Sequence, residues 1–422
     1  MSSQLRESPP PEDSDLPTGI QLTALDPAFR EDPYPILARL RENDPIHRDR
    51  ELGRIVFTRH DDVFEILRDP RYWTDPRKGL EDSFTRRFLG RDDEEPSMLL
   101  MDDPGHRRLR NLVRHPFTPR AVERWRPRAR AVAVRVIEGI EDGEFDLIES
   151  VAKPIPTVVI AELLGVDPEQ HARFKSWSDA SIKTAFSPVN DPADVAAADR
   201  ALVELRLFLA DEIERRRQHP GDDLISSMLQ TDEAGDRLTD AEIVSQCTLL
   251  LLAGNLTTTD LIGNAVAALL RHPRELEKLR ARPELMKNTV EEVLRYDSPV
   301  TNSGRIAHED MVFDGVEILQ GESLSVSLAA ANRDPAVYPE PDRFDIERRD
   351  THHQSFGGGR HFCLGAHLAR LEAAETLSVL LARFPRLSSG EGETRYAGNP
   401  SFRGFESLSV GGERSLGKGG RK

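Results

Sequence analysis

The most distinctive chemistry of the chain lies in a glycine-rich segment near the C-terminus, residues 356–365. The segment contains four glycines together with His361 and Cys363, one of only two cysteines in the chain. A helical pattern from Ala366 to Leu381 follows at once, so a thiolate at Cys363 would face backbone N–H groups and the positive end of a helix. Both features favour an ionised sulfur. The segment therefore predicts a cysteine that binds a metal.

Zinc is one alternative for that metal. A zinc site would take its ligands from His352, His353, His361 and Cys363. Their spacing departs from the usual Cys and His patterns of zinc sites, and no second cysteine lies nearby in the sequence, which argues against zinc. The remaining thiol, Cys247, lies in an apolar helical pattern and is predicted to be a core residue.

The glycine-rich segment resembles the haem-binding signature of the cytochrome P450 family. The matching residues are Phe356, Gly357, Gly359, His361, Cys363 and Gly365, and the match continues from Ala366 to Glu372. The resemblance implies haem b with the thiolate of Cys363 as axial ligand and with Phe356 and Gly365 against the cofactor. Glycines let a backbone approach a flat macrocycle, and a thiolate donates electron density that favours O–O cleavage.

Four basic residues could bind the two carboxylates of a haem. By the same resemblance they are His106, Arg110, Arg305 and His361. His106 and Arg110 lie at i and i+4 of a helical pattern, hence on one face. Charge-assisted hydrogen bonds from Arg and His are a strong way to bind a carboxylate.

A Glu-x-x-Arg pair lies in a helical pattern that precedes the glycine-rich segment. Glu292 and Arg295 are at i and i+3, and on a surface such a pair would stabilise the protein by less than about 1 kcal/mol. The family resemblance implies instead a buried network completed by a later arginine, with Arg343 at the expected place. Removing one partner of a buried pair costs roughly 3–5 kcal/mol.

Polar residues interrupt the longest apolar helical pattern, and they resemble the oxygen-binding segment of the family. Thr257 offers a hydroxyl that can donate to and accept from dioxygen. Where the family usually has an acid, this chain has Leu256, which cannot relay a proton, and Asp260 lies a turn further on. Three proton routes stay open: water ordered by Asn255 and Thr257, which we favour, a polar group of the substrate, or the use of peroxide.

The resemblance also implies a substrate pocket of mostly apolar side chains, as ligand pockets generally have. Its expected lining is Leu249, Leu252, Ala253, Val300, Thr301, Ser401 and Phe402. Residues 74–100 and 174–195 are expected to form a mobile cover over it. Apolar contacts discriminate ligands only coarsely, so this lining does not name a substrate.

The elements that must position these residues are mainly helical. Short strands are predicted at 54–58, 304–307 and 323–327, so the fold class is mainly α with small β-sheets. We expect a disordered segment at 1–16, one large P450 haem domain over 17–410, and a flexible basic tail at 411–422.

Composition limits the function classes. A net charge of −16 over 422 residues argues against nucleic-acid binding. Two distant cysteines cannot make a disulfide framework, and neither a signal peptide nor a membrane-length apolar run is apparent. We therefore predict a cytoplasmic protein with no membrane partner.

The resemblance as a whole implies a soluble bacterial-type haem-thiolate monooxygenase. It would insert one oxygen atom from O2 into a small or medium apolar organic molecule by hydroxylation, epoxidation or dealkylation. Electrons would come from NAD(P)H through a reductase and a ferredoxin, which would dock on a basic patch of Arg107, Arg108, Arg114 and Arg120. The alternatives are a peroxide-driven haem peroxygenase and a non-catalytic haem-dependent ligand-binding protein.

Overall fold

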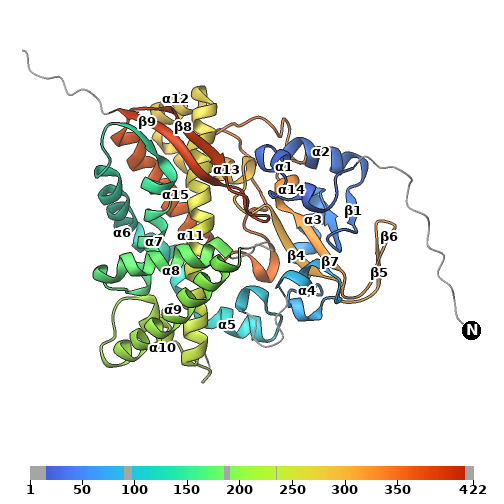
Figure 1. The fold of residues 1–422 in the computed structure, drawn as a ribbon, viewed down its shortest axis with the longest axis horizontal. Helices are drawn as coiled ribbons and strands as arrows, with labels where there is room; N and C mark the ends of the chain where they lie inside the picture. Colours follow the sequence, from blue (N-terminus) through green and yellow to red (C-terminus); the bar gives the residue numbers. More distant parts are fainter. Residues whose placement is uncertain (1–15, 90–96, 185–190, 234, 414–422) are drawn as a thin grey trace, which may run out of the picture.

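The structure is a computed structural model, and it describes residues 16–89, 97–184, 191–233 and 235–413. Figure 1 shows a helix-rich part beside a smaller part that holds the N-terminal helices and most of the strands. The long helix α11 (Asp240–Arg271) runs through the helix-rich part. The prediction of a mainly helical protein with small sheets is confirmed.

Among the described residues, the helix-rich part contains ten α-helices with the following bounds. They are α5 (Gly105–Val113), α6 (Pro119–Glu138), α7 (Pro154–Leu164), α8 (His171–Thr184), α9 (Pro192–Gln218), α10 (Leu224–Gln230), α11, α12 (Pro273–Ala281), α13 (Met286–Tyr296) and α15 (Ala366–Arg383). The smaller part holds α1 (Pro27–Glu31), α2 (Tyr34–Asn43), α3 (His60–Arg68), α4 (Phe84–Leu89) and α14 (Leu328–Ala331).

Helix α11 is the central element. A capping box between Thr239 and Glu242 begins it, and it extends over 32 residues, roughly 48 Å. By length and composition alone it could cross a membrane, but 61% of its most apolar stretch is buried inside the protein. It packs against α7, α9, α13 and α15, so its apolar character is accounted for by the core.

A four-stranded sheet forms the centre of the smaller part. Its order is β1 (Ile46–Asp49), β2 (Arg54–Phe57), β7 (Ser323–Ser327) and β4 (Asn302–Ile306). β2 and β7 are parallel with Arg54 opposite Ser323, and β7 and β4 are antiparallel with Leu324 opposite Arg305. The sheet therefore carries the basic side chains of Arg54, on β2, and Arg305, on β4.

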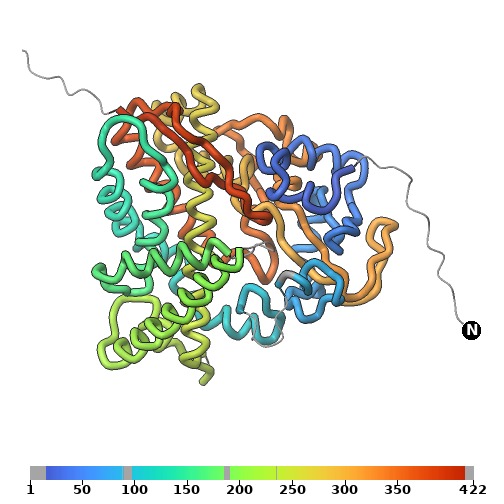
Figure 2. The backbone as a smooth tube through the Cα atoms, viewed as in Figure 1, coloured from blue at the N-terminus to red at the C-terminus, as the bar shows by residue number. Residues whose placement is uncertain are grey.

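Two smaller sheets complete the fold. One has the order β3 (Gly143–Asp146), β9 (Phe405–Glu413) and β8 (Arg386–Tyr396), and the other pairs β5 (Met311–Phe313) with β6 (Val316–Ile318). Figure 2 shows the β8–β9 hairpin, in red, beside α11, which it contacts.

The structure near the C-terminus differs from the expected flexible tail at 411–422. β9 continues through Gly411 and Gly412 to Glu413, where both glycines pair with β3 and β8. Residues 411–413 are therefore strand, which corrects the expected start of the flexible tail at 411. Residues 1–15 and 414–422 lie outside the described residues.

Candidate functional site

A cavity of about 400 Å³ lies where the cysteine loop (residues 356–365), α11, α5 and the four-stranded sheet meet. We call it the central cavity. The predicted site residues that line it are His106, Arg110, Leu249, Leu252, Ala253, Thr257, Val300, Arg305, Phe356, His361, Cys363, Gly365, Ser401 and Phe402. The structure thus brings together residues that are up to almost 300 positions apart, and leaves out Asn255 and Thr301.

Backbone contacts fix the shape of the cysteine loop. The Cys363 N–H donates to the carbonyl of Phe356 at 2.9 Å, which closes the loop. Gly359 has φ +61°, and a Cβ there would lie 2.7 Å from the carbonyl oxygen of Leu67 at the end of α3. Only glycine fits this position, because both the conformation and the close approach exclude a side chain.

The sulfur of Cys363 is accessible from the central cavity. Burial raises the pKa of the Cys363 thiol above its ordinary value, while the N–H groups of Gly365 and Ala366 and the charges of Arg110 and Arg370 act in the opposite direction. The effect of burial on the pKa outweighs that of these donors and charges. The sequence suggested that the start of the helix would ionise the sulfur, but the helix start does not do so by itself. A cation at the sulfur would supply the missing stabilisation of the thiolate.

Four basic groups meet at one part of the cavity, with His106 and Arg305 buried and Arg110 and His361 partly exposed. The imidazoles of His106 and His361 lie 4.1 Å apart, and burial followed by the charges of His106 and Arg305 lowers the pKa of His361 to about 2. Burial lowers the pKa of Arg305 to about 10, and its Nη1 donates to Gly304 at 2.7 Å. Among the described residues neither Arg305 nor Arg110 has a carboxylate partner in an ion pair. Buried cations without anions indicate a site for an anionic ligand.

These features fit a haem. Cβ atoms added to Gly254, Gly304 or Gly365, which all line the cavity, would meet no atom within 4 Å, so three glycines present open faces to it. The thiol supplies an iron ligand of the soft type, and the buried cations match two carboxylates. No cluster of three or more His, Cys, Asp or Glu side chains that could hold a metal occurs in the described part of the chain, which removes support for zinc.

The middle of α11 presents Thr257 to the cavity. Its Oγ1 donates to the carbonyl of Ala253 at 2.8 Å, so the oxygen can still accept a hydrogen bond from the cavity side. Leu256 and Thr258 also line the cavity. The sequence did not predict that Thr258 lines the cavity, because the helical repeat shows only that Thr258 is next to Thr257.

Asn255 points away from the cavity, which corrects the prediction that it orders water beside Thr257. Its Nδ2 donates to Thr157 of α7 at 2.8 Å and to Ser178 of α8 at 2.7 Å. Two positions along a helix differ by about 200° around its axis, so Asn255 and Thr257 take opposite faces.

Asp260 is buried against the turn before β9 instead of lining the cavity. A Cβ on Gly404 would lie 1.9 Å from Asp260 Oδ1, so only glycine allows this approach. Burial, with a smaller contribution from Asp297, raises the pKa of Asp260 to about 8. The carboxyl is therefore neutral at pH 7 and has no access to the cavity.

This burial predicts a pH-dependent stability. The folded pKa of about 8 lies above the ordinary 3.8, so the folded state binds the proton more tightly and wild type loses stability as pH rises between these values. Relative to Asp260→Asn, its free energy of unfolding should fall by about 1.4 kcal/mol per pH unit between pH 5 and 7 and level off above pH 8. Urea unfolding of both proteins across this range measures it. A constant difference would show an ordinary carboxyl.

Thr301 is also turned away from the cavity. Its Oγ1 donates to the carbonyl of Ser401 at 3.0 Å, and Val300 and Asn302 on either side of it line the cavity. Side chains alternate along extended backbone, so the middle residue of the three faces the other way. The lining prediction was wrong at this position.

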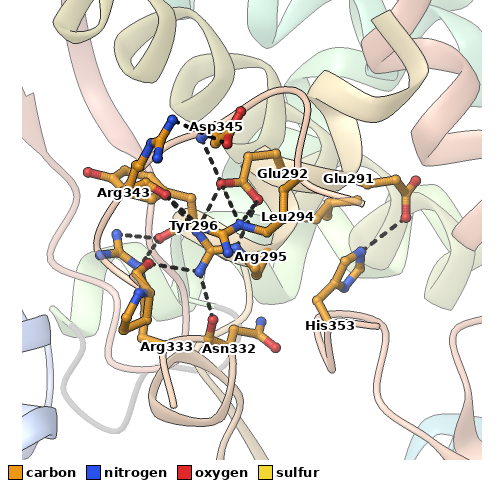
Figure 3. A network of polar contacts seen from close by, with 12 residues as sticks. Glu291, Glu292, Leu294, Arg295, Tyr296, Asn332, Arg333, Arg343, Asp345 and His353 are labelled. Carbon is orange, nitrogen blue, oxygen red and sulfur yellow. Dashed lines mark hydrogen bonds and ion pairs between the residues drawn. The ribbon is translucent and has the colours of Figure 1, made fainter. Parts of the chain in front are cut away.

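The Glu292–Arg295 pair is fully buried, and Figure 3 shows the polar contacts around it. The two side chains meet at 2.8 and 2.9 Å, and Arg295 also donates to the carbonyls of Asn332, Pro341 and Arg343. The side chain of Arg343, which the sequence suggested, is half-exposed and pairs with Glu340 and Asp345. The second guanidinium on Glu292 is that of Arg348, at 3.3 Å.

This correction has a simple physical reason. Residues 332–350 form an irregular segment, in which no helical or strand period fixes where a side chain points. Arg343 contributes its backbone carbonyl, and Arg348 enters the network with a side chain that is only 11% exposed. The network extends to Ser355, the residue before the cysteine loop, because Asn332 donates to the Ser355 hydroxyl, which donates to the carbonyl of Leu294.

Comparison with known proteins gives a consistent result. The family model for cytochrome P450 matches residues 54–396. The chain is 40% identical to cytochrome P450 107B1 of Saccharopolyspora erythraea, over 92% of this chain and 97% of that protein. It is 41% identical to a vitamin D(3) 25-hydroxylase of Pseudonocardia autotrophica, over 90% and 94%.

A solved structure agrees with these relatives. Cytochrome P450 PksS of Bacillus subtilis superposes with a TM-score of 0.84 at 35% identity, over 92% of this chain and 98% of that one. The family implies a haem with a cysteine thiolate ligand, and the cavity described above holds a thiol and buried cations suited to that group. The chain belongs to the cytochrome P450 family and is a monooxygenase of that family.

Proposed function

We propose that this protein holds haem b through Cys363 and inserts one oxygen atom of O2 into an apolar organic molecule of small or medium size. The observation that carries the proposal is a single cavity lined by a thiol, four basic groups and a threonine hydroxyl. Bound haem would supply the reductive activation of dioxygen. The relatives named as monooxygenases and hydroxylases support an enzyme over a non-catalytic ligand-binding protein.

The residues of the cavity would divide the work of holding the cofactor. Cys363 would be the iron ligand, with the N–H groups of Gly365 and Ala366 directed at its sulfur. His106, Arg110, Arg305 and His361 would bind the propionates, which would supply the anions that Arg110 and Arg305 lack among the described residues. Phe356, held under the guanidinium of Arg370 at 4.3 Å, would pack against the macrocycle.

Proton delivery would rest on Thr257. Asn255 and Asp260 face other parts of the protein, and Leu256 cannot relay a proton. The Thr257 hydroxyl now donates to the carbonyl of Ala253, so it would accept from a water molecule on the cavity side and could donate only after rotating. The substrate's own polar group remains the second route.

A Thr257→Ala variant tests this proposal. With NAD(P)H, a reductase and a ferredoxin, wild type should give oxygenated product, and the variant should consume similar NAD(P)H while its yield of product falls by about 10²-fold, the size expected for a lost proton-transfer group. Product yield per NAD(P)H is the measurement. Thr248→Ala is a matched control, because that hydroxyl also bonds to its i−4 carbonyl but does not line the cavity.

A peroxide-driven peroxygenase is the second candidate, favoured by the apolar Leu256 where an acid is usual. It would need no proton relay for reductive oxygen activation. Faster product formation from peroxide than from the reductase and ferredoxin, insensitive to Thr257→Ala, would replace the main proposal with this one.

We propose a substrate that is mostly apolar. The cavity wall is largely aliphatic and aromatic, with Phe84, Met98 and Leu100 joining the predicted pocket residues. Two relatives are named a vitamin D(3) 25-hydroxylase and a polyketide biosynthesis cytochrome P450, which supports an organic substrate. The bacterial relatives also support a cytoplasmic setting.

The ferredoxin would dock on the basic residues that are free to meet it. Arg108 is already paired with Asp236 at 2.8 Å and with Glu242, so it connects α5 to α11. Arg107, Arg114 and Arg120 are exposed, and none of them forms an ion pair with the described residues. Arg114→Glu should therefore weaken ferredoxin-supported turnover at low salt and lessen its salt dependence, with Arg386→Glu on β8 as control. Equal salt dependence in wild type and Arg114→Glu would exclude this docking surface.

A further inference from the structure

The central cavity has a polar end that the proposed reaction does not use. It is formed by Thr23, Arg54, Thr85, Ser323 and Ser325, which line the cavity beside the ring of Phe84. We call this group the polar end. Arg54 is its only charged member, and the guanidinium lies 5.2 Å from the centre of the Phe84 ring. A polar group at the end of a largely apolar pocket is the usual arrangement for fixing the orientation of a ligand.

The register of the sheet places Arg54 two strands from Arg305, with Ser323 and Ser325 of the polar end on the strand between them. Arg54 on β2 pairs with Ser323 on β7, which pairs with Ile306 on β4, next to Arg305. Neighbouring strands are about 4.8 Å apart, so the Arg54 backbone lies about 10 Å from the strand that carries Arg305. A molecule that reached both ends of the cavity would have to be elongated.

Arg54 carries a charge that is already compensated. Its Nε donates to Asp49 Oδ2 at 3.0 Å, and its Nη2 lies 3.4 Å from the carbonyl of Leu22. Asp49 Oδ1 accepts from the hydroxyl of Thr18 and the N–H groups of Gly19 and Leu52, so this carboxylate is fully satisfied. Asp49 is also the charged group that opposes the effect of burial on Arg54.

The guanidinium retains unused donors. Arginine has five N–H groups, and those of Arg54 Nη1 have no partner among the described residues. The hydroxyls of Ser323 and Thr85 are bonded to each other at 2.7 Å, which leaves one hydroxyl hydrogen for a ligand. Because Arg54 and Asp49 form a neutral pair, a buried carboxylate would add an uncompensated negative charge, whereas a neutral acceptor would only satisfy open donors.

We propose that the polar end recognises a neutral oxygen acceptor, an ester, ketone or hydroxyl oxygen, at the end of the substrate remote from the carbon that is oxidised. The substrate class is then an elongated apolar molecule with a neutral oxygen at one end. This inference rests on the proposed function and makes Arg54 its specificity-determining residue. Arg54 and Asp49 act as one unit, in which Asp49 sets the charge that a ligand meets.

Calorimetric titration of haem-loaded protein with methyl decanoate and with decanoate tests this inference. Wild type should bind the ester at least about tenfold more tightly than the carboxylate. Asp49→Asn leaves Arg54 as an unbalanced cation and should reverse the preference. The double variant Asp49→Asn/Arg54→Met keeps the pair neutral and should lose about tenfold in affinity for the ester.

Arg48→Met on the adjacent strand is the matched control, because Arg48 pairs with Glu322 and does not line the cavity. It should change neither affinity. Tighter binding of decanoate by wild type, or an ester affinity that is equal in wild type and the double variant, would overturn the inference. A reduced, carbon-monoxide-bound spectrum of each preparation keeps the outcomes separate: a missing thiolate band contradicts the proposed function, and a normal band with unchanged affinities contradicts only the role of Arg54.

Discussion

Replacement of Cys363 with serine should abolish the thiolate-type Soret band of the reduced, carbon-monoxide-bound protein. Serine keeps the size of the side chain but its hydroxyl is not ionised near neutral pH, so the proposed soft ligand to the iron is lost. Loss of turnover should exceed the about 10–100-fold that follows loss of a partner behind a metal ligand. The absorption spectrum and product formation are the two measurements.

Cys247→Ser is the control for that experiment. Cys247 is fully buried on α11 among core residues, and burial raises the pKa of its thiol, so it stays a neutral core group. The control should keep the thiolate band and lose only stability. A thiolate band that survives Cys363→Ser, or one that is absent from folded, haem-loaded wild type, would contradict the proposed ligand.

Replacement of Glu292 with glutamine should have the largest effect on stability. Glu292 is fully buried between Arg295 and Arg348, and its Oε1 also accepts from the N–H of Asp345 at 2.9 Å. The variant would leave two guanidinium groups without their shared anion, and breaking a buried pair in this way costs roughly 3–5 kcal/mol. The free energy of unfolding in urea and the fraction of protein that retains haem would both fall.

Two arginine variants separate this network from a general effect of charge. Arg343→Ala removes a half-exposed side chain and should change stability by no more than about 0.5 kcal/mol, because the network uses only its backbone carbonyl. Arg348→Ala should cost more than Arg343→Ala, because Arg348 contacts Glu292 and donates to three carbonyls. A larger loss in Arg343→Ala would contradict the assignment.

The sequence could predict the site where local geometry fixes what a residue does. Cys363, its glycines and the start of α15 lie within one short segment, so their arrangement follows from the loop itself. His106 and Arg110 share a face of α5 for the same reason, and both line the cavity. The strands at 54–57 and 323–327 were also predictable from their β-branched and apolar residues.

Prediction failed where a side chain could turn to more than one neighbour. Asn255 was assigned to the cavity because it stands beside Thr257 in the motif, yet the helical repeat sends it toward hydroxyls on α7 and α8 that no local pattern reveals. Arg348 replaced Arg343 in an irregular segment that has no period to read. Arg54 was missed because its partner Asp49 and its place in the cavity depend on how β2 meets β7.

The two hydrogen bonds that the side-chain amide of Asn255 donates also connect three separate helices. They tie the turn of α11 that carries Thr257 to Ser178 in α8, one of the helices expected to cover the cavity. A displacement of α8 must either break a buried hydrogen bond of 2.7 Å or displace that turn of α11 as well. The position of α8 is thereby linked to the turn of α11 that carries the Thr257 hydroxyl, and Asn255 makes that link.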